Sequence, residues 1–243
     1  MKENTDIEDL KNRILQLEQE KKQLLKLISH DVKSPFNKLF ALSNLLQLVS
    51  EDLNEEQLDY LTRMEWVIKE GLGVVRNLMD LRAIENDKIE LSIDEVSVTS
   101  IISETIKTYT KQASAKKQYI ETNLTNVTIQ SDKRLLERVV DHLVSNAIKF
   151  TPKEGSILLK LVQSELTIEF IISSESGIIP TDEVNKLFMR NSPLSTRPTH
   201  GESALGNGLF IAQTYAQKLL GHISFNQKGS IIEFTLTLPV VFN

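Results

Sequence analysis

One helix of this chain ends in the stretch Leu143-Val144-Ser145-Asn146-Ala147-Ile148-Lys149-Phe150-Thr151-Pro152. It begins near Ser131 or Asp132, because either side chain can cap a helix, and the proline ends it. Helices are also predicted at 99–115 and 205–219, and strands at 96–98, 119–122, 127–130, 157–162, 166–173, 222–225 and 230–238. Mixed strands and helices in this order favour an α/β sandwich, with helices layered on one face of a mixed sheet.

The residues before this region differ from it in their glycine and proline content. Its only glycines are Gly71 and Gly73 and its only proline is Pro35, so long helices are expected. The first predicted helix begins with a heptad run that has one charged interruption, at Lys21. The run consists of Ile7, Leu10, Ile14, Leu17, Lys21, Leu24 and Ile28. A second helix is predicted from about Glu56 to Glu85. We expect the two helices to form a hairpin whose wide apolar stripe predicts dimerisation into a four-helix bundle, although periodicity alone favours a plain coiled-coil stalk.

Overall composition narrows the classes of protein. The chain has 243 residues, of which 40% are hydrophobic and 25% charged, and its net charge is -5. It can bury a core, and its acidic balance argues against a nucleic-acid binder. With no cysteine there is neither a disulfide framework nor a thiolate metal site, which favours the cytoplasm. We expect no membrane segment within this chain, which could still be the cytoplasmic part of a longer membrane-bound sensor.

The first predicted helix contains a histidine that could act as a nucleophile, within Ser29-His30-Asp31-Val32-Lys33-Ser34-Pro35. Neutral imidazole is a nucleophile near neutral pH, and Asp31 can hold its tautomer and accept its proton. Pro35 cannot bond the carbonyl of Asp31, so it kinks the helix there at a cost of ~3 kcal/mol. Ser34 lies one turn after His30 and could orient water or a phosphoryl oxygen. Taken alone, a His-Asp pair on a helix is more often a solvated surface pair than a catalytic one.

Two segments together carry a resemblance to a known family. Ser29–Phe36 resembles the phosphoacceptor box of sensor histidine kinases, and Leu143–Pro152 resembles their asparagine box. Gly206-Asn207-Gly208-Leu209 and the terminal Phe234–Pro239 extend the resemblance over nearly the whole chain. It implies a coiled-coil helix at 1–28, a dimerisation and histidine-phosphotransfer hairpin at 29–90, and a Bergerat-type ATP-binding domain at 91–243.

The resemblance implies roles for individual residues. Asn146 would coordinate Mg²⁺ through its amide oxygen, a ligand type that this cation prefers. Lys149 would lie on the phosphate side of the nucleotide, and Phe150 would form a wall of its cavity. Gly206 and Gly208 resemble a second glycine-rich box, where backbone N–H groups approach phosphates at the start of a helix.

The first glycine-rich box of the family is altered here. In the family it supplies an aspartate that bonds the adenine amino group, followed by glycines. In an ungapped alignment Ser174 takes the aspartate position, and Ser176 and Ile178 replace the glycines. With one residue deleted, Glu175 stands for the aspartate and Gly177 for the first glycine. Loss of a charged bond to adenine would cost about 1.5–3 kcal/mol, or roughly tenfold to hundredfold in affinity.

Two further features concern the same domain. His142 lies one turn before Asn146, where the family commonly has another asparagine. The irregular run Phe188–Leu205, rich in Ser, Thr, Pro and Asn, would be the mobile lid over ATP.

Three functions follow. In the first, the chain is an ATP-dependent histidine kinase: His30 takes the γ-phosphoryl group, Asp31 takes the proton, and the phosphoryl group passes to an aspartate of a response-regulator receiver domain. In the second, His30, Asp31 and Ser34 act alone as an ATP-independent phosphotransfer relay or phosphatase. In the third, the dimer is a non-enzymatic interaction scaffold. We favour the kinase, because a site with no function would have no need to keep these four residues together: Asn146, Lys149, Gly206 and Gly208.

Overall fold

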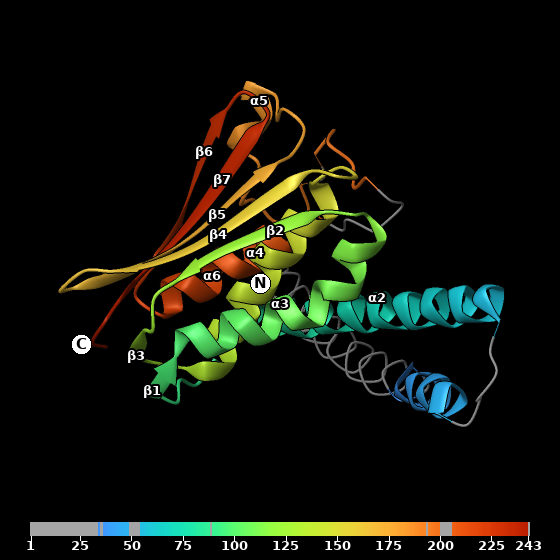
Figure 1. The fold of residues 1–243 in the computed structure, drawn as a ribbon. Helices are drawn as coiled ribbons and strands as arrows, with labels where there is room; N and C mark the ends of the chain where they lie inside the picture. The colour runs from blue at the N-terminus through green and yellow to red at the C-terminus, as the bar shows by residue number, and fades with distance from the viewer. Residues whose placement is uncertain are drawn as a thin grey trace, which may run out of the picture. The chain divides into compact units, whose positions relative to one another are not determined.

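The computed structural model describes residues 34, 36–48, 54–87, 89–192, 194–199 and 206–242. The chain divides into two compact units, Met1–Lys88 and Ile89–Asn243, and each is described by itself (Figure 1). The predicted heptad run lies outside the described residues. Within the described residues, no helix combines the length and the apolar character needed to cross a lipid bilayer.

The first unit contains a helical segment at 36–48 and the long helix α2, Glu55–Glu85. Asn54 begins α2 through a reciprocal cap: its Oδ1 accepts from the N–H of Gln57 at 2.9 Å, and Oε1 of Gln57 accepts from its N–H at 2.9 Å. This capping box satisfies two otherwise unpaired donors. The predicted second helix is therefore confirmed, with a start defined by its own sequence.

The two helical segments of this unit are in contact. The ring of Phe36 packs against Gly71, and Nζ of Lys69 lies 5.5 Å from the ring centroid of Phe40. Part of the apolar stripe of α2 is buried, namely Leu61, Ile68, Leu72 and Val75. Other apolar side chains of the unit remain exposed: Leu39, Leu42, Leu45, Leu46, Leu48, Leu58, Tyr60, Met64, Val67, Val74 and Met79. One chain thus covers only part of the stripe.

The second unit is built on a five-stranded mixed sheet of order β2-β4-β5-β7-β6. Its strands are β2 (Tyr119–Leu124), β4 (Ser156–Gln163), β5 (Thr167–Glu175), β6 (His222–Lys228) and β7 (Ile231–Pro239). β2 and β4 are parallel and all other neighbours are antiparallel. A separate two-stranded antiparallel sheet pairs β1 (Asp94–Ser97) with β3 (Thr128–Ser131).

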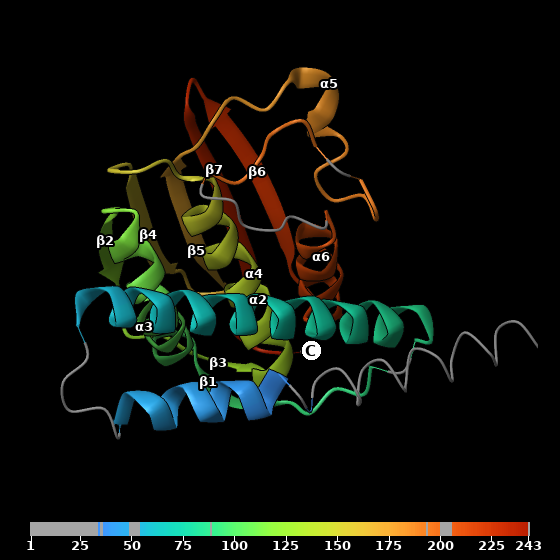
Figure 2. The ribbon, with the colours of Figure 1, turned by 90° about the vertical axis from the view of Figure 1, so that its right-hand side faces the viewer.

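Three helices cover one face of the five-stranded sheet: α3 (Val98–Ala115), α4 (Lys133–Phe150) and α6 (Gly208–Lys218) (Figures 1 and 2). Alternate residues of β4 and β5 are buried beneath them, among them Ile157, Leu159, Leu161, Ile168, Phe170 and Ile172. Period-two burial is expected when only one face of a sheet is covered. The predicted α/β sandwich is confirmed.

Two details differ from the sequence reading. A short helix, α5 (Thr181–Val184), lies between β5 and α6, where no helix is predicted, and α6 begins at Gly208 rather than at 205. Below α5, the side chains of Ile179, Leu187 and Ile232 form a small apolar core, with partly buried Leu194 and Phe234 packed against it. This core packs residues on both sides of α5 against β7.

Candidate functional site

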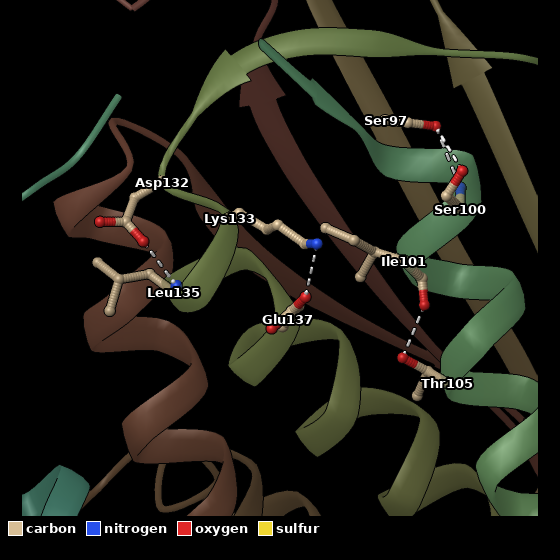
Figure 3. Close-up of polar contacts among 8 residues, drawn as sticks. All are labelled: Ser97, Ser100, Ile101, Thr105, Asp132, Lys133, Leu135 and Glu137. Atoms are coloured by element: carbon tan, nitrogen blue, oxygen red, sulfur yellow. Dashed lines mark hydrogen bonds and ion pairs between the residues drawn. The ribbon is translucent and has the colours of Figure 1, made fainter. Parts of the chain in front are cut away.

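The helix α4 carries three of the predicted nucleotide-binding residues. Oδ1 of Asp132 accepts from the N–H of Leu135 at 3.0 Å, so Asp132 rather than Ser131 is the cap (Figure 3). The apolar face of the helix is buried along its length. Asn146, Lys149 and Phe150 are only half-buried, at the carboxyl end of the helix.

Buried donors hold the carboxyl end of α4. Nζ of Lys116, a side chain with no exposed surface, donates to the carbonyls of Ile148 at 2.6 Å and Lys149 at 3.1 Å. Nε2 of Gln118 donates to the carbonyls of Ile148 at 3.0 Å and Thr151 at 2.7 Å. The last carbonyls of a helix lack partners within it and carry partial negative charge. These bonds therefore fix the backbone from which Lys149 and Phe150 project.

The start of α6 lies against α4. A Cβ placed on Gly208 would lie 3.3 Å from Nδ1 of His142, so glycine permits this close approach. Gly206 has a φ of 69°, which favours glycine. Between them, Asn207 is buried and makes no cap to α6, because its Oδ1 accepts from the N–H of Asn191 at 2.8 Å. Both predicted glycines thus have a structural reason.

A chain of polar contacts surrounds His142. Burial lowers the pKa of His142 to about 3, and the positive charges of Arg138 and Lys149 act in the same direction. One guanidinium nitrogen of Arg138 lies 3.4 Å from Nε2 of His142, and another lies 3.1 Å from Oδ2 of Asp141. The hydroxyl of Tyr109 donates to Oδ1 of Asp141 at 2.8 Å. Burial, followed by the charge of Asp141, raises the pKa of Tyr109 well above its usual value.

The altered glycine-rich box begins at the end of β5. Ser174 and Ser176 are both buried, and their Oγ atoms lie 3.0 Å apart. Glu175 is exposed, and its Oε2 accepts from the N–H of Ser156 at 3.3 Å. Gly177 follows on an exposed loop. By strand alternation Ser174 belongs to the buried face of β5, so the ungapped alignment is the one that gives the aspartate position to a buried polar group.

Residues 194–199 connect the separate parts of this region. The N–H and Oγ of Ser195 donate to Oε2 of Glu183 in α5, at 2.9 and 3.0 Å. The methyl carbon of Thr196 lies 3.9 Å from the Cβ that would be built on Gly177. The segment therefore passes from α5 beside the loop that follows β5.

Thr199 completes the connection. Its N–H donates to the carbonyl of Lys149 at 3.0 Å, and its Oγ1 donates to the carbonyl of Thr151 at 2.9 Å. The segment thus ends on the carboxyl end of α4. Part of the predicted lid therefore contacts both the loop that carries Gly177 and the end of α4 that carries Lys149.

Two of the predicted catalytic residues, His30 and Asp31, lie outside the described residues. Ser34 is helical and half-buried in the first unit. Of the predicted lid, 188–192 and 194–199 are described. The sequence did not point to five residues of this region: Lys116, Gln118, Arg138, Tyr109 and Thr199. The one available signal was the spacing of Arg138 and Asp141, which puts opposite charges three residues apart on one helix.

Comparisons with known proteins show which proteins this chain resembles. Residues 131–241 match the family "Histidine kinase-, DNA gyrase B-, and HSP90-like ATPase". The sensor histidine kinase GacS of Pseudomonas protegens is 26% identical over 248 residues, which cover 98% of this chain and 27% of that protein. The heme sensor protein HssS of Staphylococcus aureus is 27% identical over 225 residues, or 92% of this chain and 48% of that protein. The chain therefore spans at most about half the length of these relatives.

Solved structures share the fold. Full-length ShkA in complex with AMPPNP aligns with a TM-score of 0.65 and 20% identity, covering 91% of this chain and 46% of that one. The histidine kinase AdeS of Acinetobacter baumannii aligns with a TM-score of 0.57 and 21% identity, covering 87% of this chain and 98% of that one.

Proposed function

We propose that this chain, which belongs to the sensor histidine kinases, is an ATP-dependent protein-histidine kinase core. The observation that carries the proposal is the contact of Gly208 with α4, one turn before Asn146. It brings a glycine-led helix start, the usual place for phosphate, next to the helix that carries Asn146 and Lys149. The boundaries predicted at 1–28, 29–90 and 91–243 are part of this proposal.

The residues of the second unit fit a magnesium-bound nucleotide. Among the described residues no group of three or more His, Asp or Glu side chains could hold a metal alone. Mg²⁺ commonly takes one or two protein oxygens and completes its shell with phosphates and water. Asn146 would supply such an oxygen, Lys149 a positive charge near the phosphates, and Phe150 an apolar wall. Gly206 and Gly208 would let the backbone approach the phosphates.

The reaction would use residues of the first unit. A ring nitrogen of His30 attacks the γ-phosphorus of ATP, a nitrogen–phosphorus bond forms, and the bond to the bridging oxygen breaks to release ADP. Asp31 takes the imidazole proton, and Ser34 orients water or a phosphoryl oxygen when the phosphohistidine reacts further. The phosphoryl group then passes to an aspartate carboxylate on a response-regulator receiver domain.

A homodimer is part of the proposal. The uncovered apolar side chains of the hairpin, including Leu42, Met64 and Val67, are 61%, 48% and 53% exposed in the single chain. A second copy would bury them in a four-helix bundle. The cytoplasm, where response regulators would be available, is the compartment we propose for this part of the protein.

One observation favours the second candidate, a phosphotransfer relay or phosphatase that needs no ATP. The buried hydroxyls of Ser174 and Ser176 bond each other where the family has an acid for adenine. A hydroxyl without charge gives adenine a weaker bond than a carboxylate does. Weak nucleotide binding would leave His30, Asp31 and Ser34 as the functional set.

Labelling with γ-labelled ATP tests the kinase. We expect an acid-labile, base-stable phosphoprotein that is lost in His30→Ala and kept in His222→Ala, a matched change at an exposed histidine on β6. Label that persists in His30→Ala would contradict the assignment of the nucleophile.

A binding measurement separates the two candidates. Mg-ATP at a hundred times its dissociation constant should stabilise the protein by about 2.7 kcal/mol, or roughly 5–10 °C in melting temperature. If millimolar Mg-ATP gives no shift and a phosphorylated regulator still loses its label in a His30-dependent manner, the relay replaces the kinase.

A further inference from the structure

The buried end of β5 carries a pair of serine hydroxyls. Ser174 and Ser176 are each only 5% exposed, and their Oγ atoms lie 3.0 Å apart. In the sheet register Ser174 stands between Ile157 of β4 and Ile232 of β7, which are also buried. The pair is thus flanked by apolar residues, where a polar group without a partner is destabilising.

This pair does not satisfy all of its own hydrogen-bonding groups. Each hydroxyl has one proton to donate and two lone pairs that accept. The bond between the two Oγ atoms uses one of the two protons, and neither hydroxyl has another partner among the described residues. One buried O–H group is therefore a donor whose acceptor must come from outside the described part of the chain, and unused lone pairs lie beside it.

Two carboxylates of β5 and β7 lie near this pair in the register but on the other face of the sheet. Glu175 is exposed, and its Oε2 accepts from the N–H of Ser156 at 3.3 Å. Glu233 stands opposite Ser173 and accepts from its Oγ at 2.9 Å. Because alternate residues of a strand face opposite sides, neither carboxylate shares the buried face of Ser174. The hydroxyl pair thus keeps its free proton.

The hydroxyl pair is connected to the rest of the candidate site. Gly177 follows Ser176, and the Cβ position of Gly177 lies 3.9 Å from the methyl carbon of Thr196. The same segment continues to Thr199, whose N–H donates to the carbonyl of Lys149 at 3.0 Å. One segment of chain therefore joins the loop after the hydroxyl pair to the end of α4, which carries the residues proposed for the phosphates.

A carboxylate and a pair of hydroxyls favour different purine bases. An ionised carboxylate only accepts hydrogen bonds, so it favours the amino group at C6 of adenine. Hypoxanthine and guanine carry a carbonyl at C6, which would meet the carboxylate as one acceptor facing another. A hydroxyl pair can give its free proton to that carbonyl and accept from the neighbouring N1–H with a lone pair. Replacing the acid by two hydroxyls therefore removes the cause for rejecting a carbonyl at C6.

We propose that Ser174 and Ser176 determine the base specificity of the nucleotide site, which binds purine nucleotides with a carbonyl at C6 at least as tightly as adenine nucleotides. The inference rests on the proposed function, since it names the class of base that the same site takes. It uses the ungapped alignment, in which Ser174 takes the position of the acid that bonds adenine. The free proton of the buried pair is the observation that carries it.

Calorimetric titration of the whole chain with the Mg²⁺ complexes of ADP and inosine diphosphate (IDP) tests the specificity. IDP differs from ADP only in the carbonyl at C6 and the proton on N1, so the comparison isolates the contact with the hydroxyls. We expect the dissociation constant of IDP to be equal to that of ADP or lower. Binding of ADP that is tighter than that of IDP by more than about threefold would overturn the proposal.

Placing an acid in the pair should create selectivity for adenine. We expect Ser174→Asp to favour ADP over IDP roughly tenfold to hundredfold, the effect of one hydrogen bond to a charged group. Ser224→Asp, at an exposed position of β6, is the control and should leave the ratio of the two affinities unchanged. If circular dichroism shows that Ser174→Asp does not fold, Ser176→Asp places the acid on the loop just after β5. A folded acid variant with an unchanged ratio would contradict the proposal, because a merely structural role weakens both nucleotides alike.

Removing both hydroxyls tests whether they contact the base at all. We expect Ser174→Ala/Ser176→Ala to bind ADP and IDP roughly twofold to tenfold more weakly, since either base loses neutral hydrogen bonds. Ser173→Ala, on the other face of β5, is the matched control and should bind both nucleotides as the unmodified protein does. Unchanged affinities in the double variant would also overturn the proposal.

The outcomes distinguish this inference from the proposed function. If the unmodified protein binds ADP and discriminates against IDP, the inference fails and the kinase proposal stands. If it binds IDP but not ADP, the inference stands and the dependence on ATP in the proposed function fails. If it binds neither nucleotide, both proposals fail.

Discussion

Replacing Gly71 with alanine should weaken the helical hairpin of the first unit, whereas the same change at Gly73 should strengthen it. Both glycines lie inside α2, where alanine is favoured over glycine by about 1 kcal/mol. A Cβ on Gly71 would lie 2.5 Å from Cε1 and 2.6 Å from Cζ of Phe36, whereas among the described residues no atom outside its chain neighbours and its own helix backbone lies within 4 Å of the corresponding position on Gly73. The neighbours of Gly73 on its own helix face are polar: Lys69, Glu70, Arg76 and Asn77.

The magnitude follows from these distances. Carbon atoms in contact are about 3.5–4.0 Å apart, so the ring of Phe36 must move by about 1 Å in Gly71→Ala. Overpacking of this kind costs about 1–3 kcal/mol. Gly73→Ala should therefore gain about 1 kcal/mol of unfolding free energy, and Gly71→Ala should be about 1–3 kcal/mol less stable than Gly73→Ala.

Urea unfolding followed by the fluorescence of Trp66 measures this difference, because the only tryptophan of the chain lies in α2. Equal stabilisation by the two substitutions would refute the close packing of Phe36 on Gly71. Since Phe36 ends the predicted phosphoacceptor box, a displaced ring should also slow labelling of His30 in Gly71→Ala and leave it unchanged in Gly73→Ala.

Three further changes probe the second unit. Because the pKa of His142 is about 3 in the folded state and near 6.5 when unfolded, only the unfolded state binds this proton as pH falls from 6.5 toward 3. Stability should drop over that range by up to about 1.4 kcal/mol per pH unit, and urea unfolding at pH 6.5 and 5 should show a smaller drop in His142→Gln. Tyr109→Phe removes the bond to Asp141 and should cost about 1–2 kcal/mol in thermal unfolding, so an unchanged melting temperature would contradict that bond. Gly221→Ala would drive its methyl group into the backbone carbonyl of Thr237 and should cost about 3 kcal/mol, and a stable, well-folded variant in circular dichroism would rule this contact out.

The elements that sequence could predict are those with local signals. Helix α4 has a cap at Asp132, an apolar face along its length and a proline after Thr151. The strands of the five-stranded sheet alternate because only one face is covered by helices. Gly206 and Gly208 are predicted to be site residues from their resemblance to a glycine-rich box and their position before a helix, and this remains a prediction; the structure gives Gly206 a positive φ and places His142 against Gly208.

The contacts that sequence could not predict join distant parts of the chain. A lysine such as Lys116 is expected at the surface, yet its side chain is fully buried. It bonds the end of α4, which is more than thirty residues away in the sequence. Oδ1 of Asn207 accepts from the N–H of Asn191 and does not cap α6, and no local pattern indicates this bond. Periodicity predicts the apolar stripe of α2. It does not predict which of the apolar side chains are buried within one chain and which stay exposed. The burial of Ser174 follows from strand alternation in the folded sheet, and the choice between the two alignments of the first glycine-rich box remains a prediction.

The bond between Asn191 and Asn207 also bears on how this protein could be engineered. One side-chain acceptor ties two positions that are sixteen apart in the sequence, so their separation in space is set by that bond. Doubling the length of such a loop adds only about 0.6 kcal/mol of closure cost. An insertion of a reporter peptide between the two tied positions, but outside residues 194–199 that bond α4 and α5, should therefore be tolerated, while the same insertion directly after Asn207 would shift the start of α6.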